Sequence, residues 1–238
     1  TTLFRSQEIL DVGGFDAVLS FAATVKSPLQ VGVALGQIGD DRITSRMLPE
    51  YLVSHQTHEK QFASGFVWGR FYNQGWQWVD TLDRTKWNFE AQCKLLLNLP
   101  FDRETWQRSS AWLKDSEGDY WRKVQVNPYQ TPSDLLPVID KLLDVARPHA
   151  AIACLYSRMH AKQLLDSAYA IRALLDAVSI KESADTTVDA YYIVELIKAL
   201  QKDPTTDQEG LFRVEWAYLQ LLHQHRDLKP TVLEGRLA

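Results

Sequence analysis

The spacing of the apolar residues is the feature that most constrains this chain, because they recur every three or four residues rather than every second one. Between residues 135 and 145 they fall on one side of a helix: Leu135, Leu136, Val138, Ile139, Leu142, Leu143 and Val145. Pro148 ends this run, since proline cannot continue a helix from its interior. The same period predicts further helices over 150–156, 164–178, 191–200 and 211–222. No alternating run bounded by tight turns predicts a strand, so we expect an all-α fold.

The predicted helices come in pairs that repeat at roughly 30–45 residues, the range of tetratricopeptide (TPR) and HEAT units. We therefore expect an irregular α-solenoid of antiparallel helix pairs, TPR-like or HEAT-like, in which each pair buries its apolar side against its neighbours. A compact helical bundle is the alternative. Residues 1–238 would form a single helical-repeat domain, with a possible internal boundary near 124–131.

Several helix starts are marked by a hydroxyl residue followed three positions later by an acceptor side chain, the capping-box pattern. Such tetrads open at five positions: Ser27, Thr131, Thr186, Thr206 and Thr231. The glycine-rich stretch 31–40 could be mistaken for a strand and phosphate loop. Its apolar spacing instead predicts a short helix that ends at Gly36 or Gly39.

Composition limits the possible partners and the compartment. The net charge of −4 provides no overall positive field for nucleic acid, which makes nucleic acid an unlikely partner. No apolar run reaches the ~18–20 residues that cross a bilayer, so we expect no membrane partner. Cys93 and Cys154 are too few for a disulfide framework, which favours a cytoplasmic protein with two buried thiols. Because the chain begins at Thr1 and stops soon after a new helix start at Pro230, we expect it to be excised from a longer polypeptide.

Residue patterns that carry chemistry are sparse. The chain has no Gly-x-Ser-x-Gly nucleophile motif and no phosphate-binding loop. His55, His58 and Glu59 are the best local metal ligands, but their order differs from His-Glu-x-x-His and they fall at an expected helix junction. We interpret them as a polar turn. We therefore predict no catalytic residue, no cofactor and no metal site, and hence no enzyme.

The aromatic content is concentrated in one segment. Seven of the eight tryptophans fall there: Trp68, Trp76, Trp78, Trp87, Trp106, Trp112 and Trp121. Two interpretations stay open: a recognition groove, because arginine and aromatic residues alternate there, or large rings that fill wide spaces between helices. Trp76 and Trp78 follow Gly75, so we expect them to begin a new element and to be partly exposed. The predicted partner-binding residues are Trp76, Trp78, Arg84, Arg103, Arg108 and Arg122.

Two stretches resemble helix-pair segments of long bacterial multidomain proteins. One is the run 215–222, followed by Pro230, Leu233 and Glu234; the other is the series formed by 99–101, Trp106 and 120–122. The resemblance covers residues 60–238. It implies a helical sensor or scaffold region attached to nucleotide-binding or effector domains, in some cases in anti-phage defence. It assigns no functional residue.

Together these patterns predict a non-enzymatic, protein-binding or peptide-binding helical scaffold or sensor module of a larger bacterial protein. Its partner would be a protein, a peptide or another domain of the same chain. Two alternatives stay open: a nucleic-acid-binding helical repeat that uses local arginine patches, and an enzyme of unrecognised type with a site between helices.

Overall fold

The computed structural model describes residues 2–39, 41–130, 135–180, 189–224 and 229–237. Every regular element in these ranges is a helix and none is a strand, which confirms the all-α prediction. The contacts divide the chain into two compact units. Unit 1 comprises Thr1–Pro100 and Glu104–Tyr120, and unit 2 comprises Phe101–Arg103 and Trp121–Ala238. The solenoid arrangement itself stays a prediction.

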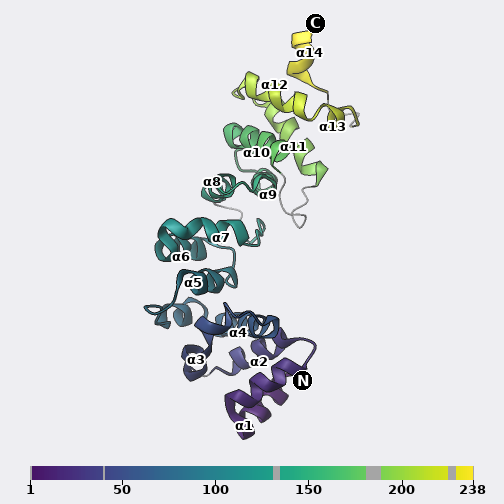
Figure 1. The fold of residues 1–238 in the computed structure, drawn as a ribbon. Coiled ribbons are helices and arrows are strands. Elements are labelled where there is room, and N and C mark those ends of the chain that lie inside the picture. The colour runs from purple at the N-terminus through teal and green to yellow at the C-terminus, as the bar shows by residue number, and fades with distance from the viewer. Residues whose placement is uncertain (1, 40, 131–134, 181–188, 225–228, 238) are drawn as a thin grey trace. The chain divides into compact units, whose positions relative to one another are not determined.

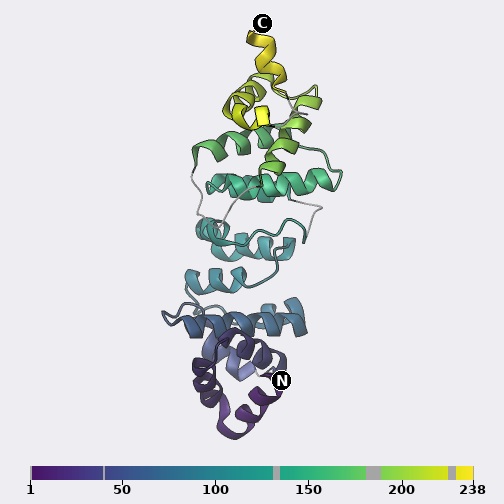
Figure 2. The same ribbon diagram turned by 90° about the vertical axis from the view of Figure 1, so that its right-hand side faces the viewer.

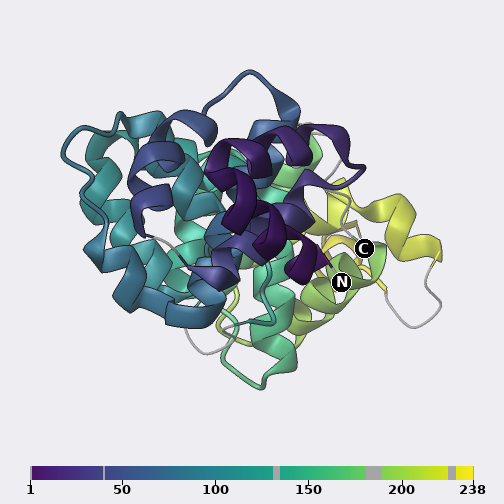
Figure 3. The ribbon, with the colours of Figure 1, turned by 90° about the horizontal axis from the view of Figure 1, so that it is seen from below.

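Unit 1 is built around a long central helix, α4 (Figure 1). Its elements are α1 (Thr2–Thr24), α2 (Pro28–Ile38), α3 (Asp41–Tyr51), α4 (Thr57–Thr81), α5 (Phe89–Leu97), α6 (Arg103–Leu113), η1 (Lys114–Ser116) and α7 (Glu117–Lys123), the last of which continues into unit 2. Helix α4 contacts α1, α2 and α3. In Figure 3, which views the ribbon from below, α1 is the purple helix of unit 1.

Helices α2 and α4 pack with their backbones in direct contact. A Cβ atom at Gly32 would lie 2.0 Å from the carbonyl oxygen of Phe62, and one at Gly65 would lie 2.0 Å from that of Leu29. Gly36 and Gly69 continue the contact one turn further along each helix, so the two helices run in the same direction. Only glycine permits this approach, because any side chain would overlap the opposite backbone.

Unit 2 is a succession of shorter helices. They are α8 (Leu136–Asp144), α9 (Pro148–His160), α10 (Ser167–Ser179), α11 (Ala190–Lys202), α12 (Gln208–Ala217), α13 (Leu219–Gln224) and α14 (Thr231–Leu237). Helix α9 contacts α8, α10 and α11, and α12 contacts α10 and α14 (Figure 2). The core comes from the predicted apolar stripes; Ile139, Leu155 and Leu174 are fully buried.

The predicted helix ends are confirmed in part. Helix α2 ends at Gly39, which adopts φ 78° and donates its amide to the carbonyl of Leu35, so 31–40 is helical as expected. Ser27 is the N-cap of α2, although its side chain makes no capping hydrogen bond. The tetrads 131–134 and 186–189 lie outside the described residues, except for Asp189, which caps α11.

Three sequence expectations in unit 2 are wrong. Asp207, not Thr206, caps α12, because the Asp207 carboxylate accepts hydrogen bonds from two free backbone amides of the first turn. Leu164 precedes α10 and is 91% exposed, since the helix starts only after its cap at Asp166. The predicted helix 211–222 is interrupted at Tyr218, and Trp216, expected on its apolar side, is 62% exposed.

Candidate functional site

Arginine and tryptophan side chains of unit 1 meet where the end of α4 lies beside α6. The guanidinium carbon of Arg108, on α6, lies 4.0 Å from the ring centroid of Trp76, on α4. The same guanidinium group donates to both carboxylate oxygens of Asp80, with Nη2 at 3.0 Å from Oδ1 and 2.9 Å from Oδ2. Arg108 is therefore fixed by a cation–π contact and an ion pair at once.

A second arginine stacks beside the first. The guanidinium carbon of Arg84 lies 3.5 Å from the ring centroid of Trp112, one helical turn beyond Arg108 on α6. Partial burial lowers the pKa of Arg84, while Asp80 opposes this effect and Arg108 adds to it. Guanidinium groups remain charged in proteins, so the result is a half-buried cation held flat on an indole ring.

The backbone of α4 explains why these side chains meet. Gly75 interrupts the helix with φ 56° and ψ −145°, a conformation that favours glycine. Just after this kink, the ring of Trp76 meets that of Phe71 edge-on at 5.0 Å. One turn before it, Trp68 and Tyr72 stack at 5.6 Å and are 54% and 71% exposed. Exposed aromatic rings thus precede the arginine cluster along the same helix.

The structure corrects one predicted site residue. Trp78 is only 2% exposed, so the expectation that it is partly exposed is wrong. Gly75 does break the helix, as expected, but Trp78 lies in the helical turn that follows the break with its side chain buried. Its ring packs edge-on against Phe66 at 6.5 Å and lies 5.7 Å from the guanidinium carbon of Arg70.

The other predicted residues divide between the two units. Trp76, Arg84 and Arg108 come together in unit 1, as described above. Arg103 and Arg122 are exposed and belong to unit 2, and their role in binding stays a prediction. The sequence analysis did not single out Asp80, although its position four residues after Trp76 and four before Arg84 is a signal that could have identified it.

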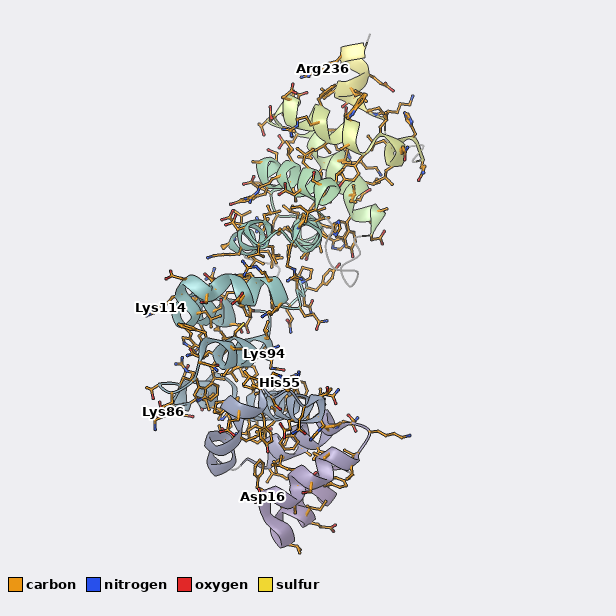
Figure 4. The ribbon with its side chains drawn as sticks, viewed as in Figure 1. Asp16, His55, Lys86, Lys94, Lys114 and Arg236 are labelled. Atoms are coloured by element: carbon orange, nitrogen blue, oxygen red, sulfur yellow. The ribbon has the colours of Figure 1, made fainter. Side chains whose placement is uncertain are left out.

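The positions considered as metal ligands lie at the junction between α3 and α4. His55 is exposed in the turn between α3 and α4 (Figure 4), and Glu59 accepts a hydrogen bond from the hydroxyl of Ser54. No three His, Cys, Asp or Glu side chains of the described residues are grouped as metal ligands. Cys93 and Cys154 are buried, as expected, and burial raises the pKa of Cys154 to about 12.

None of the helices in the described part of the chain is both long enough and apolar enough to cross a bilayer. Comparison with known proteins gives no further assignment: no family model matches the chain, and no curated protein or solved structure matches it significantly.

Proposed function

We propose that this protein binds another protein chain through the α4–α6 face, defined by Trp68, Tyr72, Trp76, Arg84, Arg108 and Trp112. The observation that carries the proposal is the arrangement of Arg108 on both Trp76 and Asp80. Tryptophan, tyrosine and arginine contribute most of the binding energy in protein interfaces. Side chains that are already ordered lose less conformational entropy on binding, so this face is prepared for a partner.

The exposed pair Trp68–Tyr72 adds apolar area on the same helix, before the kink at Gly75. The two rings support each other by stacking while most of their surface stays in contact with water. Burying such rings beneath a partner is favourable, and aromatic residues are enriched at the centres of protein interfaces.

A protein partner suits the charges better than nucleic acid does. Arg108 is paired with Asp80, and Arg84 lies on an indole ring with the same carboxylate nearby, so neither presents an unopposed positive charge to a phosphate. The chain as a whole carries a net charge of −4. A protein surface with carbonyl and aliphatic groups would match this combination of rings and compensated cations.

The proposal includes a scaffold or sensor role within a larger bacterial cytoplasmic protein, with another protein or another domain as partner. The resemblance of residues 60–238 to helix-pair regions of bacterial multidomain proteins supports this role. The packing of α9 between α8 and α10 supports a repeat arrangement of helix pairs in unit 2.

The test is quantitative affinity capture with the full chain from a bacterial lysate, followed by binding measurements with each purified candidate. The double variant Trp68→Ala/Tyr72→Ala should weaken the binding of a true partner by about tenfold or more. Trp216→Ala is the matched control, because Trp216 is 62% exposed but lies in unit 2. Equal binding by the wild type and the double variant, with both folded, would contradict the proposal.

A further inference from the structure

The two stacked arginines of the α4–α6 face differ in how their N–H groups are used. In Arg108 every guanidinium nitrogen has an acceptor within the protein. Nε donates to Oδ1 of Asp80 at 3.2 Å, and Nη1 donates to the backbone carbonyl of Glu104 at 3.2 Å. Nη2 donates to both carboxylate oxygens of Asp80. The chain itself therefore supplies the carboxylate that Arg108 binds.

Arg84 lies on an indole ring in the same way but lacks such a carboxylate. Its guanidinium group covers Trp112, and no group in the part of the chain that the structure describes accepts a hydrogen bond from it. Of its three nitrogens only Nε is both buried and unpaired. The two terminal nitrogens of this half-buried residue therefore face the solvent with their N–H groups unused.

Stacking leaves the hydrogen-bonding edge of a guanidinium group available. All its N–H groups point outward in the plane of the group, so a ring against its flat side blocks none of them. A carboxylate matches two of these N–H groups at once, which makes the pair short and directional. Arg108 shows the full arrangement, with Trp76 against the flat side and Asp80 at the edge. Arg84 has only the ring.

The local charges indicate how much negative charge is missing. Two arginines and one aspartate leave a single positive charge at this site. Asp80 attracts Arg84 and Arg108 repels it, while both oxygens of Asp80 are occupied by Arg108. One carboxylate from outside would neutralise the remaining charge, whereas a phosphate dianion would leave an excess of negative charge beside Asp80.

We propose that Arg84 binds a glutamate or aspartate side chain of the partner protein. This inference rests on the proposed protein-binding role of the α4–α6 face, and it names the group that the partner must present there. The carboxylate accepts hydrogen bonds from the terminal nitrogens of Arg84. Trp112 acts as a positioning residue, because its ring holds the guanidinium group flat with its edge toward the solvent.

The probe is a library of random synthetic peptides with amidated C-termini, selected on the full chain, so that any carboxylate they share is a side chain. Selected peptides should share a glutamate or aspartate. Fluorescence anisotropy then measures the affinity of the tightest peptide. Arg84→Gln should weaken it by about tenfold or more. Arg84→Lys keeps the charge without the planar edge and should restore only part of the loss. Arg213→Gln, the same change at an exposed arginine of unit 2, should leave it unchanged.

A double-mutant cycle tests the pairing itself. Replacing the shared acid of the peptide by its amide should weaken binding to the wild type by about tenfold and have little further effect in Arg84→Gln. Losses that simply add would place the carboxylate elsewhere on the protein and overturn the proposal. A peptide with phosphoserine at the same position should bind more weakly than the acid. Tighter binding would identify phosphate as the ligand and would also overturn it.

The variant Trp68→Ala/Tyr72→Ala separates this inference from the proposed function. Peptides that bind this variant weakly but bind Arg84→Gln as tightly as the wild type would support the protein-binding face and overturn the assignment of Arg84. Selection of no peptide would contradict both. Arg84 makes no hydrogen bond to a described residue, so Arg84→Gln should unfold within a few degrees of the wild type. If it does not, the cycle is run with Arg84→Lys, where additive losses have the same meaning.

Discussion

Glu215 on α12 caps helix α14 through Thr231. Its Oε1 accepts hydrogen bonds from the amide of Thr231 at 2.8 Å and from the hydroxyl of the same residue at 3.1 Å. Oε2 accepts from the amides of Val232 at 3.0 Å and Leu233 at 2.8 Å. The first amides of a helix lack partners within it and carry partial positive charge, so a fully buried carboxylate is well matched to this position.

Replacing this carboxylate should loosen the C-terminal part of unit 2. Glu215→Gln removes the charge and leaves at least one buried amide unpaired, so we expect a loss of about 2–3 kcal/mol in the free energy of unfolding. Urea denaturation of the full chain measures it. Glu209→Gln is the matched control, because that side chain is 62% exposed and pairs only at the surface with Arg236. Equal losses in the two variants would show that Glu215 does not hold α14.

The glycine contact between α2 and α4 makes a second stability prediction. Alanine at Gly32 or Gly65 would place a Cβ within 2.0 Å of a carbonyl oxygen, so the helices must move apart. We expect each variant to lose about 2 kcal/mol or more in thermal or urea unfolding. Gly235→Ala is the control: nothing lies within 4 Å of a Cβ there, and alanine should stabilise α14 by up to about 1 kcal/mol. A Gly32→Ala protein as stable as the wild type would contradict the described packing.

The sequence predicted the helices well where an apolar stripe and an end signal agree. The run 135–145 followed by Pro148, and the short helix ending at Gly39, both appear as expected. In these cases the information is local: the period identifies the buried side, and the terminal residue determines where hydrogen bonding stops.

The errors occur where distant contacts decide the outcome. Gly75 breaks α4 as predicted, yet Trp78, three residues beyond the break, is buried beside Phe66 rather than exposed. Hydrophobic spacing alone likewise cannot show that Glu215 is fully buried, because the amides that satisfy it come from another helix. The candidate site needed the same long-range information, since Asp80 and Arg108 meet only in the folded chain.

The two cysteines should be inert in the native protein. Both are buried, and burial raises the pKa of Cys154 to about 12, which leaves almost no thiolate at pH 8. A thiol reagent followed by absorbance should therefore react with neither residue until denaturant is added. Ser179→Cys places a thiol at an exposed position and should react promptly under the same conditions. Rapid reaction of the wild type would contradict the burial of these residues.

Asp83 and Asp203 provide an internally controlled titration, because both precede a threonine by two residues. In each case the hydroxyl and then the amide of that threonine lower the pKa of the aspartate below its ordinary value. A lowered pKa in the folded state means that the carboxylate contributes stability above its unfolded-state pKa. That contribution is lost as the pH falls through the folded-state pKa.

Thr85→Val removes the hydroxyl of Thr85 and keeps the amide, so the pKa of Asp83 should rise toward its ordinary value while that of Asp203 stays low. Carboxyl chemical shifts followed by NMR from acid to neutral pH report both groups in one sample. In Thr205→Val the roles should reverse. An unchanged pKa of Asp83 in Thr85→Val would show that the hydroxyl does not set it, since the 2.7 Å hydrogen bond from that hydroxyl is the largest contribution to the lowering.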